Sequence, residues 1–208
     1  VTIRFIDLGT GCGVVGLAYL LLKRNICQGF GMDCNPELIA AAQNNTAKLG
    51  FSDRFALHTG ELADTRFLEN LRMEASPVQL VMANPPWRLV GSGRFPATEA
   101  RRKALFGDKG TFPLFASAAS SLLEEDGRFA CIISPDRLQD MLAALDGAGL
   151  TPYLLQYIHK QKTSPATFVL IEARKGAHAK PSVAEPIALY GPERFFTLES
   201  LAFCPFLR

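Results

Sequence analysis

Asp7-Leu8-Gly9-Thr10-Gly11-Cys12-Gly13-Val14-Val15-Gly16 carries the strongest structural signal near the start of this chain. The apolar run Ile3 to Asp7 precedes it and a helical pattern from about Val14 to Arg24 follows, so a glycine turn is predicted between a buried strand and a helix. Glycine is favoured in such a turn because the backbone needs unusual dihedrals and because a Cβ would block a ligand lying against the main chain. The run therefore predicts a ligand-binding turn at the carboxyl end of a strand.

The same strand and helix alternation continues along the chain. Further strands are expected at Gly29–Asp33, Phe55–His58, Val78–Met82 and Arg128–Ile133, helices at 36–49, Ala63–Met73, Phe112–Glu125 and Asp136–Ala148, and a hairpin at Tyr153–His159 and Ala166–Ala173. Residues 175–186 are expected to be a loop, and the structure of residues 187–208 is left open. Alternation with crossover helices predicts an α/β fold with a doubly wound, mostly parallel, Rossmann-like sheet of seven strands that includes one antiparallel hairpin strand.

Length and composition fit an ordinary globular domain. The chain has 208 residues, of which 48% are hydrophobic and 20% charged, so residues 1–208 are expected to form a single domain. It begins with Val1, and we expect an upstream segment to be missing. The longest apolar stretch, Val14 to Leu22, is too short to span a bilayer, so no membrane association is expected. Five cysteines without a Cys-x-x-Cys pair favour free thiols and a cytoplasmic location. The oligomeric state is not predicted.

Two cofactor types compete for the glycine turn. Gly11, Gly13 and Gly16 satisfy the G-x-G-x-x-G pattern of dinucleotide binding, and Asp33 lies at about the distance expected of a ribose-binding carboxylate. Asp7 favours the other type, because a carboxylate just ahead of the turn would repel a pyrophosphate but attract the ammonium group of S-adenosylmethionine. The residues therefore favour S-adenosylmethionine.

Further cofactor contacts are expected where the second and third strands end. Asp33 can accept hydrogen bonds from ribose hydroxyls, and Glu61 can accept one from the adenine amino group. The predicted cofactor-binding residues are Asp7, Gly9, Thr10, Gly11, Asp33, Cys34, Gly60, Glu61, Leu62 and Asn84. No metal site is expected.

Asn84-Pro85-Pro86-Trp87, after the fourth strand, is the most specific motif in the chain. An amino group on an aromatic ring is a poor nucleophile because its lone pair is delocalised, so a catalyst must accept both of its hydrogens. The Asn84 side-chain oxygen and the Pro85 carbonyl are suitable acceptors, and the prolines hold the backbone extended. Trp87 offers a face for stacking a planar target. The predicted catalytic residues are therefore Asn84, Pro85, Pro86 and Trp87.

The segment after this motif is the most basic in a chain whose net charge is only +2. Between residues 88 and 109 there are six basic residues against two acidic ones, Glu99 and Asp108. The predicted nucleic-acid-binding residues in it are Arg88, Arg94, Arg101, Arg102 and Lys103. Such a loop at the mouth of a site favours a nucleic acid over a protein substrate, whereas the simpler interpretation is a solvated loop.

With both motifs, the chain resembles the class I methyltransferases that carry an Asn-Pro-Pro-aromatic signature. Within them it resembles the bacterial tRNA adenine-N6 methyltransferases that modify valine tRNA beside the anticodon. The similarity covers the glycine turn, Asn84 to Trp87, the basic loop, the strand start at Gly127 to Phe129 and the tail Leu189 to Phe196. It implies S-adenosylmethionine as donor and a structured RNA, expected to be a tRNA, as acceptor. The family more often has Tyr at position 87 and often Asp at position 61.

The leading hypothesis is therefore methylation of adenine N6 in tRNA. The alternatives use the same signature on other amino groups. They are methylation of guanine N2 in ribosomal RNA, of adenine or cytosine in DNA, and of the glutamine amide of a release factor. A non-catalytic binding module is a further alternative, and the intact Asn84-Pro85-Pro86 argues against it.

Overall fold

The computed structural model describes residues 2–23, 27–86, 88–89, 106–176, 181–193 and 195–203. The long strands are β1 (Ile3–Leu8), β2 (Cys27–Asp33), β3 (Phe55–Thr59), β4 (Leu80–Ala83), β7 (Arg128–Ile133), β8 (Leu150–His159) and β9 (Ala166–Lys175). Two-residue strands are β5 (Arg88–Leu89), β6 (Phe106–Gly107), β10 (Ser182–Val183) and β11 (Ile187–Ala188). The helices are α1 (Val14–Leu22), α2 (Pro36–Lys48), α3 (Thr65–Ala75), α5 (Thr111–Leu122), α6 (Leu138–Gly147) and α7 (Leu198–Phe203), with a 3-10 turn η1 (Pro135–Arg137) before α6. None of the described helices has the length and apolar composition that a membrane crossing requires.

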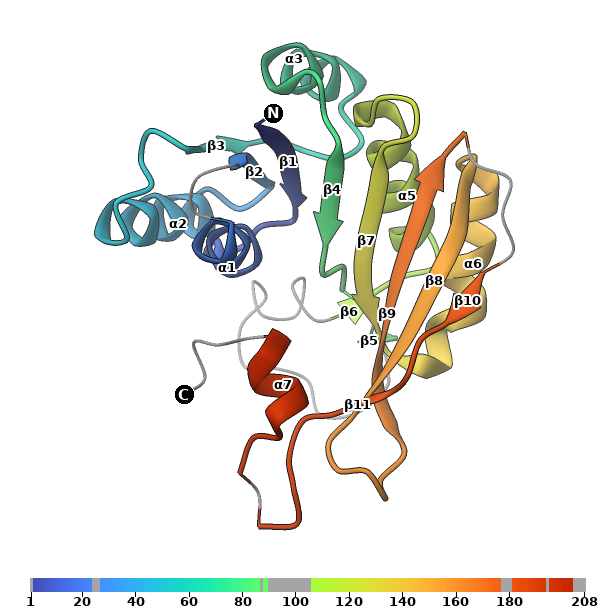
Figure 1. The fold of residues 1–208 in the computed structure, drawn as a ribbon. Helices are drawn as coiled ribbons and strands as arrows, with labels where there is room; N and C mark the ends of the chain where they lie inside the picture. The colour runs from blue at the N-terminus through green and yellow to red at the C-terminus, as the bar shows by residue number, and fades with distance from the viewer. Residues whose placement is uncertain are drawn as a thin grey trace.

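The main sheet is doubly wound with the strand order β10-β8-β9-β7-β4-β1-β2-β3, and β11 pairs with the end of β8 (Figure 1). The described pairs in this sheet are parallel except those of β9, which runs antiparallel to β7 and β8. The seven-stranded, mostly parallel sheet expected from the sequence is confirmed, with β10 and β11 as short additions. The chain winds outward from β1 to β3 and then returns to place β4 on the other side of β1. Open α/β sheets hold ligands at such a reversal, at the carboxyl ends of the strands.

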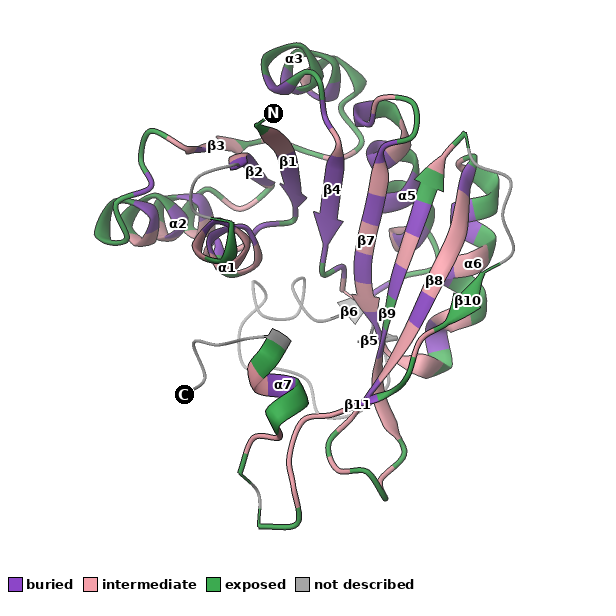
Figure 2. Cartoon of the chain, viewed as in Figure 1, coloured by how far each residue is buried: buried purple, intermediate pink, exposed green. Residues whose placement is uncertain are grey.

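Helices cover the sheet in two layers, and the side chains of β1 show why. Phe5 packs with Leu17 and Leu20 of α1, whereas the next residue, Ile6, belongs to the larger apolar cluster formed with α3, α5 and α6. Successive side chains of a strand point to opposite faces, so a run of apolar residues needs a helix layer on both sides. In Figure 2 β4 is accordingly buried along its whole length, and β1 is buried from Phe5 onward.

Two helices start at side chains that accept backbone hydrogen bonds. Asn35 accepts from the N–H of Glu37 at 2.9 Å, as its place before Pro36 predicts. Asp64 accepts from the N–H of Phe67 at 3.0 Å. The third helix therefore begins at Thr65, and the expected start at Ala63 is wrong by two residues because Asp64 is the cap.

The C-terminal region is more ordered than the sequence indicated. Residues 175–186, expected to be a loop, contain β10, whose Ser182 pairs with Leu154 of β8. Beyond them Ile187 of β11 pairs with Ile158, and α7 follows. Two-residue strands are too short to show the alternation of apolar and polar residues that predicts a strand, so only pairing with β8 reveals them.

Candidate active site

The glycine turn follows β1 and its shape depends on Gly9, Gly11 and Gly13, which have φ values of 66°, 56° and 86°. These values lie in the left-handed region, where side chains other than that of glycine are strained. The Thr10 N–H donates to the Met32 carbonyl at 2.9 Å, which ties the turn to the end of β2. A Cβ added at Gly11 would meet no atom within 4 Å, so the main chain there borders open space. The turn can therefore be approached closely by a ligand.

Asp7, the last but one residue of β1, holds this turn against α1. Its side chain is only 1% exposed, and its Oδ2 accepts hydrogen bonds from the Thr10 hydroxyl at 2.7 Å and from the Gly16 N–H at 3.0 Å. Gly16 is the third residue of α1, so the carboxylate satisfies an N–H that has no partner within the helix. Burial raises the pKa of Asp7 and these two hydrogen bonds lower it. Burial has the larger effect, so the pKa is raised to about 6. The contact to a cofactor ammonium stays a prediction.

Asp33 joins three elements at the carboxyl end of β2. Its Oδ2 accepts from the Gly11 N–H at 3.0 Å and its Oδ1 from the Asn35 N–H at 2.9 Å, while its carbonyl accepts from the Gly60 N–H at 3.1 Å. Each carboxylate oxygen has a second lone pair, and the side chain is only partly buried. Asp33 can therefore accept further hydrogen bonds from a ligand that lies over Gly11.

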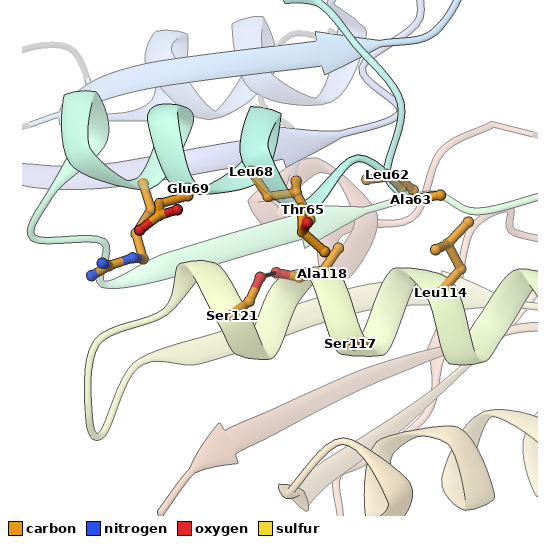
Figure 3. A pocket seen from close by; sticks show the side chains of 10 residues that line it. Leu62, Ala63, Thr65, Leu68, Glu69, Leu114, Ser117, Ala118 and Ser121 are labelled. Atoms are coloured by element: carbon orange, nitrogen blue, oxygen red, sulfur yellow. Dashed lines mark hydrogen bonds between the residues drawn. The ribbon is translucent and has the colours of Figure 1, made fainter.

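The remaining predicted cofactor residues lie after β2 and β3. Cys34 and Glu61 are exposed, and Leu62 is partly buried. Leu62 also lines a cavity of about 490 Å³ between α3 and α5, whose wall includes Leu68, Leu114 and Ala118 (Figure 3). The other predicted cofactor residues do not line this cavity. It is a groove between two helices and does not coincide with the strand ends that carry the motifs.

Asn84 lies beside the glycine turn. Leu8 pairs with Ala83, so Asn84 and Gly9 are the next residues on adjacent parallel strands. The Asn84 side chain is exposed, and no described residue hydrogen-bonds to it, whereas Pro85 is buried. No described N–H donates to the Pro85 carbonyl. Within the described part of the chain, neither acceptor expected from the motif has a hydrogen-bond partner.

The segment after Pro86 is held by a second, two-stranded sheet, in which Arg88 pairs with Phe106 and Leu89 with Gly107. A Cβ added at Gly107 would lie 2.4 Å from the Pro86 carbonyl oxygen, so only glycine allows this approach. The sequence reasoning missed Gly107, which lies in a segment expected to be irregular. Its contact with Pro86 links residues far apart in the sequence, and no local pattern signals it.

Two further supports of the turn were missed. The Asn45 side chain donates to the Cys12 carbonyl at 3.0 Å, and a Cβ at Gly9 would lie 3.3 Å from the Phe115 ring. Asn45 could have been found, because it is a polar residue one turn after Ala42 on the inward side of α2. Phe115 is indistinguishable from any other core aromatic of α5 in the sequence.

Part of the predicted site lies outside the described residues. These residues are Trp87, Arg94, Arg101, Arg102 and Lys103. Arg88 is described only by its backbone in β5. Among the described residues, no group of three or more His, Cys, Asp and Glu side chains is placed to hold a metal ion.

The fold is shared with methyltransferases of known structure. The solved structure of a predicted O-methyltransferase, protein Atu636 from Agrobacterium tumefaciens, superposes with a TM-score of 0.73 at 21% identity, over 99% of this chain and 88% of that one. At this identity the similarity establishes the fold. No model of a protein family matches the chain.

Curated relatives confirm the resemblance to tRNA adenine-N6 methyltransferases. The tRNA1(Val) (adenine(37)-N6)-methyltransferase of Porphyromonas gingivalis is 31% identical over 140 residues, which are 65% of this chain and 51% of that protein. The release factor glutamine methyltransferase of Caulobacter vibrioides is 29% identical over 153 residues, 70% of this chain and 50% of that protein. The chain thus spans about half the length of these relatives.

Proposed function

We propose that this chain is an S-adenosylmethionine-dependent N-methyltransferase that modifies adenine N6 in tRNA. The observation that carries the proposal is the position of Asn84 and Pro85, directly beyond β4 and beside the glycine turn of β1. This position brings two acceptors without a described hydrogen-bond partner next to a turn that admits a ligand against its main chain. The similarity to the Porphyromonas gingivalis enzyme supports tRNA as substrate.

The strand ends fit S-adenosylmethionine. Open space beside Gly11 admits the cofactor, Asp33 would accept from its ribose hydroxyls, and Glu61 would accept from its adenine amino group. Leu62, which follows Glu61, would add apolar contact. When bound, S-adenosylmethionine supplies an electrophilic methyl group on a sulfonium centre.

The contribution of the protein to catalysis is orientation. The Asn84 oxygen and the Pro85 carbonyl each accept one hydrogen of the target amino group, which favours a tetrahedral nitrogen with its lone pair directed at the methyl donor. No general base is required at this stage, because a methylated and positively charged nitrogen releases its proton readily. Proximity and orientation then account for most of the rate enhancement. Trp87 would stack on the base and hold it in the plane that this geometry requires.

The basic segment between residues 88 and 109 supports RNA over protein as the substrate, because clustered Lys and Arg side chains bind phosphates. A glutamine amide is the main competitor, given the similarity to the Caulobacter vibrioides enzyme. Action on tRNA would place the protein in the cytoplasm, which agrees with the lack of a disulfide among the described cysteines, Cys12, Cys27, Cys34 and Cys131.

Mass spectrometry of labelled products tests the reaction. The protein is incubated with methyl-labelled donor and either bulk tRNA, ribosomal RNA, DNA or a release factor, and the digested products are analysed. Labelled N6-methyladenosine from tRNA is expected. Label in N2-methylguanosine, in a DNA base or in methylglutamine would assign the activity to the corresponding alternative.

Asp33→Ala should weaken binding of S-adenosylmethionine about ten- to a hundredfold, because hydrogen bonds to a charged acceptor are worth about 1.5–3 kcal/mol. Isothermal titration calorimetry measures this directly. Asp53→Ala, which removes an exposed carboxylate ahead of β3, is the matched control and should bind normally. Heat with NAD but none with S-adenosylmethionine in the unmodified protein would refute the cofactor assignment.

Neutralising Arg101, Arg102 and Lys103 together should weaken tRNA binding and flatten its dependence on salt. Each phosphate contact that is lost should lower the slope of log K against log salt concentration by about one. Fluorescence anisotropy at several salt concentrations gives the slope, and calorimetry should show unchanged cofactor affinity. An unaltered slope would mean that these three residues do not contact phosphates.

A further inference from the structure

The hairpin between β8 and β9 and the C-terminal tail form one hydrogen-bonded unit, here called the hairpin-tail lobe (residues 159–165, 187–193 and 195–200). The N–H groups of Leu189 and Tyr190 donate to the carbonyls of His159 and Lys160 at 2.9 and 2.8 Å. The Gln161 side chain donates to the Gly191 carbonyl at 3.2 Å. The hairpin tip is therefore fixed to the tail by bonds from both main chain and side chain.

The tail turn is closed by its own contacts. The Gly191 N–H donates to the Phe195 carbonyl at 2.8 Å, and the rings of Tyr190 and Phe196 lie 5.0 Å apart. The Ser200 hydroxyl of α7 bonds to the Leu189 carbonyl at 3.0 Å. These contacts fix the backbone of Phe195 and Phe196 against Tyr190 and Gly191.

The lobe stands beside the candidate active site. Ala83 of β4 aligns with Cys131, Cys131 with Ile171, and Ile171 with Leu155 of β8. His159 therefore lies four residues, or about 13 Å, beyond the level at which β4 ends, and three strand spacings, or about 14 Å, to its side. Figure 1 shows the tail on the side to which the arrowheads of β1, β4 and β7 point. A few nucleotides of an RNA strand span this distance.

The lobe exposes the side chains that RNA recognition uses. Phe195 is 74% exposed although its backbone is fixed, and Leu198 is 85% exposed. Lys160 and Lys162 are exposed at the hairpin tip. An exposed aromatic ring on a hydrogen-bonded backbone offers a stacking face for a base, and lysines at the hairpin tip can meet phosphates.

We propose that the hairpin-tail lobe binds the RNA that flanks the target nucleotide, with Phe195 stacking on an unpaired base and Lys160 and Lys162 contacting phosphates. This inference rests on the proposed function. Glu193 and Glu199 are exposed on the tail and repel phosphates, so the contact is confined to the hairpin tip and the Phe195 ring. In the sequence the lobe lies far from the basic segment of residues 88–109, so it would add a second RNA contact to the chain.

The test compares Phe195→Ala with Phe195→Trp and with the control Met73→Ala, which truncates a 63% exposed side chain on α3, away from the lobe. Phe195→Ala should raise the apparent KM and Kd for tRNA about tenfold at nearly unchanged kcat, because stacking binds ground state and transition state alike. Phe195→Trp should restore both values.

The double variant Lys160→Ala with Lys162→Ala tests the phosphate contacts. It should lower the slope of log K for tRNA against log salt concentration by about one to two, whereas Lys48→Ala on α2 should leave this slope unchanged.

The outcomes separate the lobe from the proposed reaction. If the unmodified protein methylates tRNA but Phe195→Ala keeps its KM and Kd, the lobe proposal is wrong and the activity stands. If the unmodified protein neither binds nor methylates RNA, for instance because it acts on a release factor, both proposals are wrong. Unchanged thermal stability and cofactor binding of Phe195→Ala exclude misfolding as the cause of a defect.

Discussion

Asn84→Ala lowers the single-turnover rate of methyl transfer about a hundredfold, while the affinity for S-adenosylmethionine changes little. The reason is that the Asn84 oxygen accepts a hydrogen whose bond strengthens as the amino nitrogen becomes tetrahedral. Losing one positioned polar partner of a transition state costs roughly 3 kcal/mol, by analogy with removal of an oxyanion-hole donor. The side chain is exposed and no described residue hydrogen-bonds to it, so its removal should not disturb the fold.

Asn44→Ala is the matched control, because Asn44 is an exposed asparagine on α2, away from the strand ends. Trp87→Ala should behave differently from Asn84→Ala and mainly raise KM, since stacking on the base stabilises the bound substrate as well as the transition state. An Asn84→Ala protein that methylates at the normal rate would remove the central element of the proposed mechanism.

The fold could be predicted in large part because each βα unit has a local signature. The glycine turn after Asp7, the cap at Asn35 and the stop at Asn84-Pro85-Pro86 all depend on residues adjacent in sequence, and the structure confirms the elements that they delimit. The pairing of β10 and β11 with β8 could not be predicted. These strands have two residues each and exist only because β8 extends past them, which is a tertiary effect.

The sequence could predict those residues of the candidate site that lie at the carboxyl ends of the strands. Parallel strands bring Asp7, Asp33 and Asn84 to one edge of the sheet, whatever the loops do. The contacts that hold these residues were not predictable. The support of Pro86 by Gly107 and the position of the hairpin-tail lobe both depend on long-range pairing, which leaves no local pattern in the sequence.

The buried carboxyl group of Asp7 makes the protein less stable as the pH rises. Its pKa is about 6 in the folded protein, against 3.8 as the ordinary value that applies to the unfolded chain. Between these values the folded state holds a proton that the unfolded state has lost, so the free energy of unfolding falls as pH increases through this window. The full difference corresponds to about 3 kcal/mol.

Asp7→Asn should remove this dependence, because the amide does not titrate and its oxygen can still accept from Thr10 and Gly16. The free energy of unfolding of the variant minus that of the unmodified protein should therefore rise by about 3 kcal/mol between about pH 3.5 and pH 7. Urea denaturation at several pH values measures it, and the subtraction cancels the titration of the other carboxyl groups. A difference that stays constant with pH would show that folding does not raise the pKa of Asp7. Calorimetry on the same variant decides its second role. A loss of cofactor affinity of about tenfold or more would place the ammonium group of S-adenosylmethionine at Asp7, because a charge-assisted hydrogen bond contributes about that much, whereas an unchanged affinity would restrict Asp7 to holding the glycine turn.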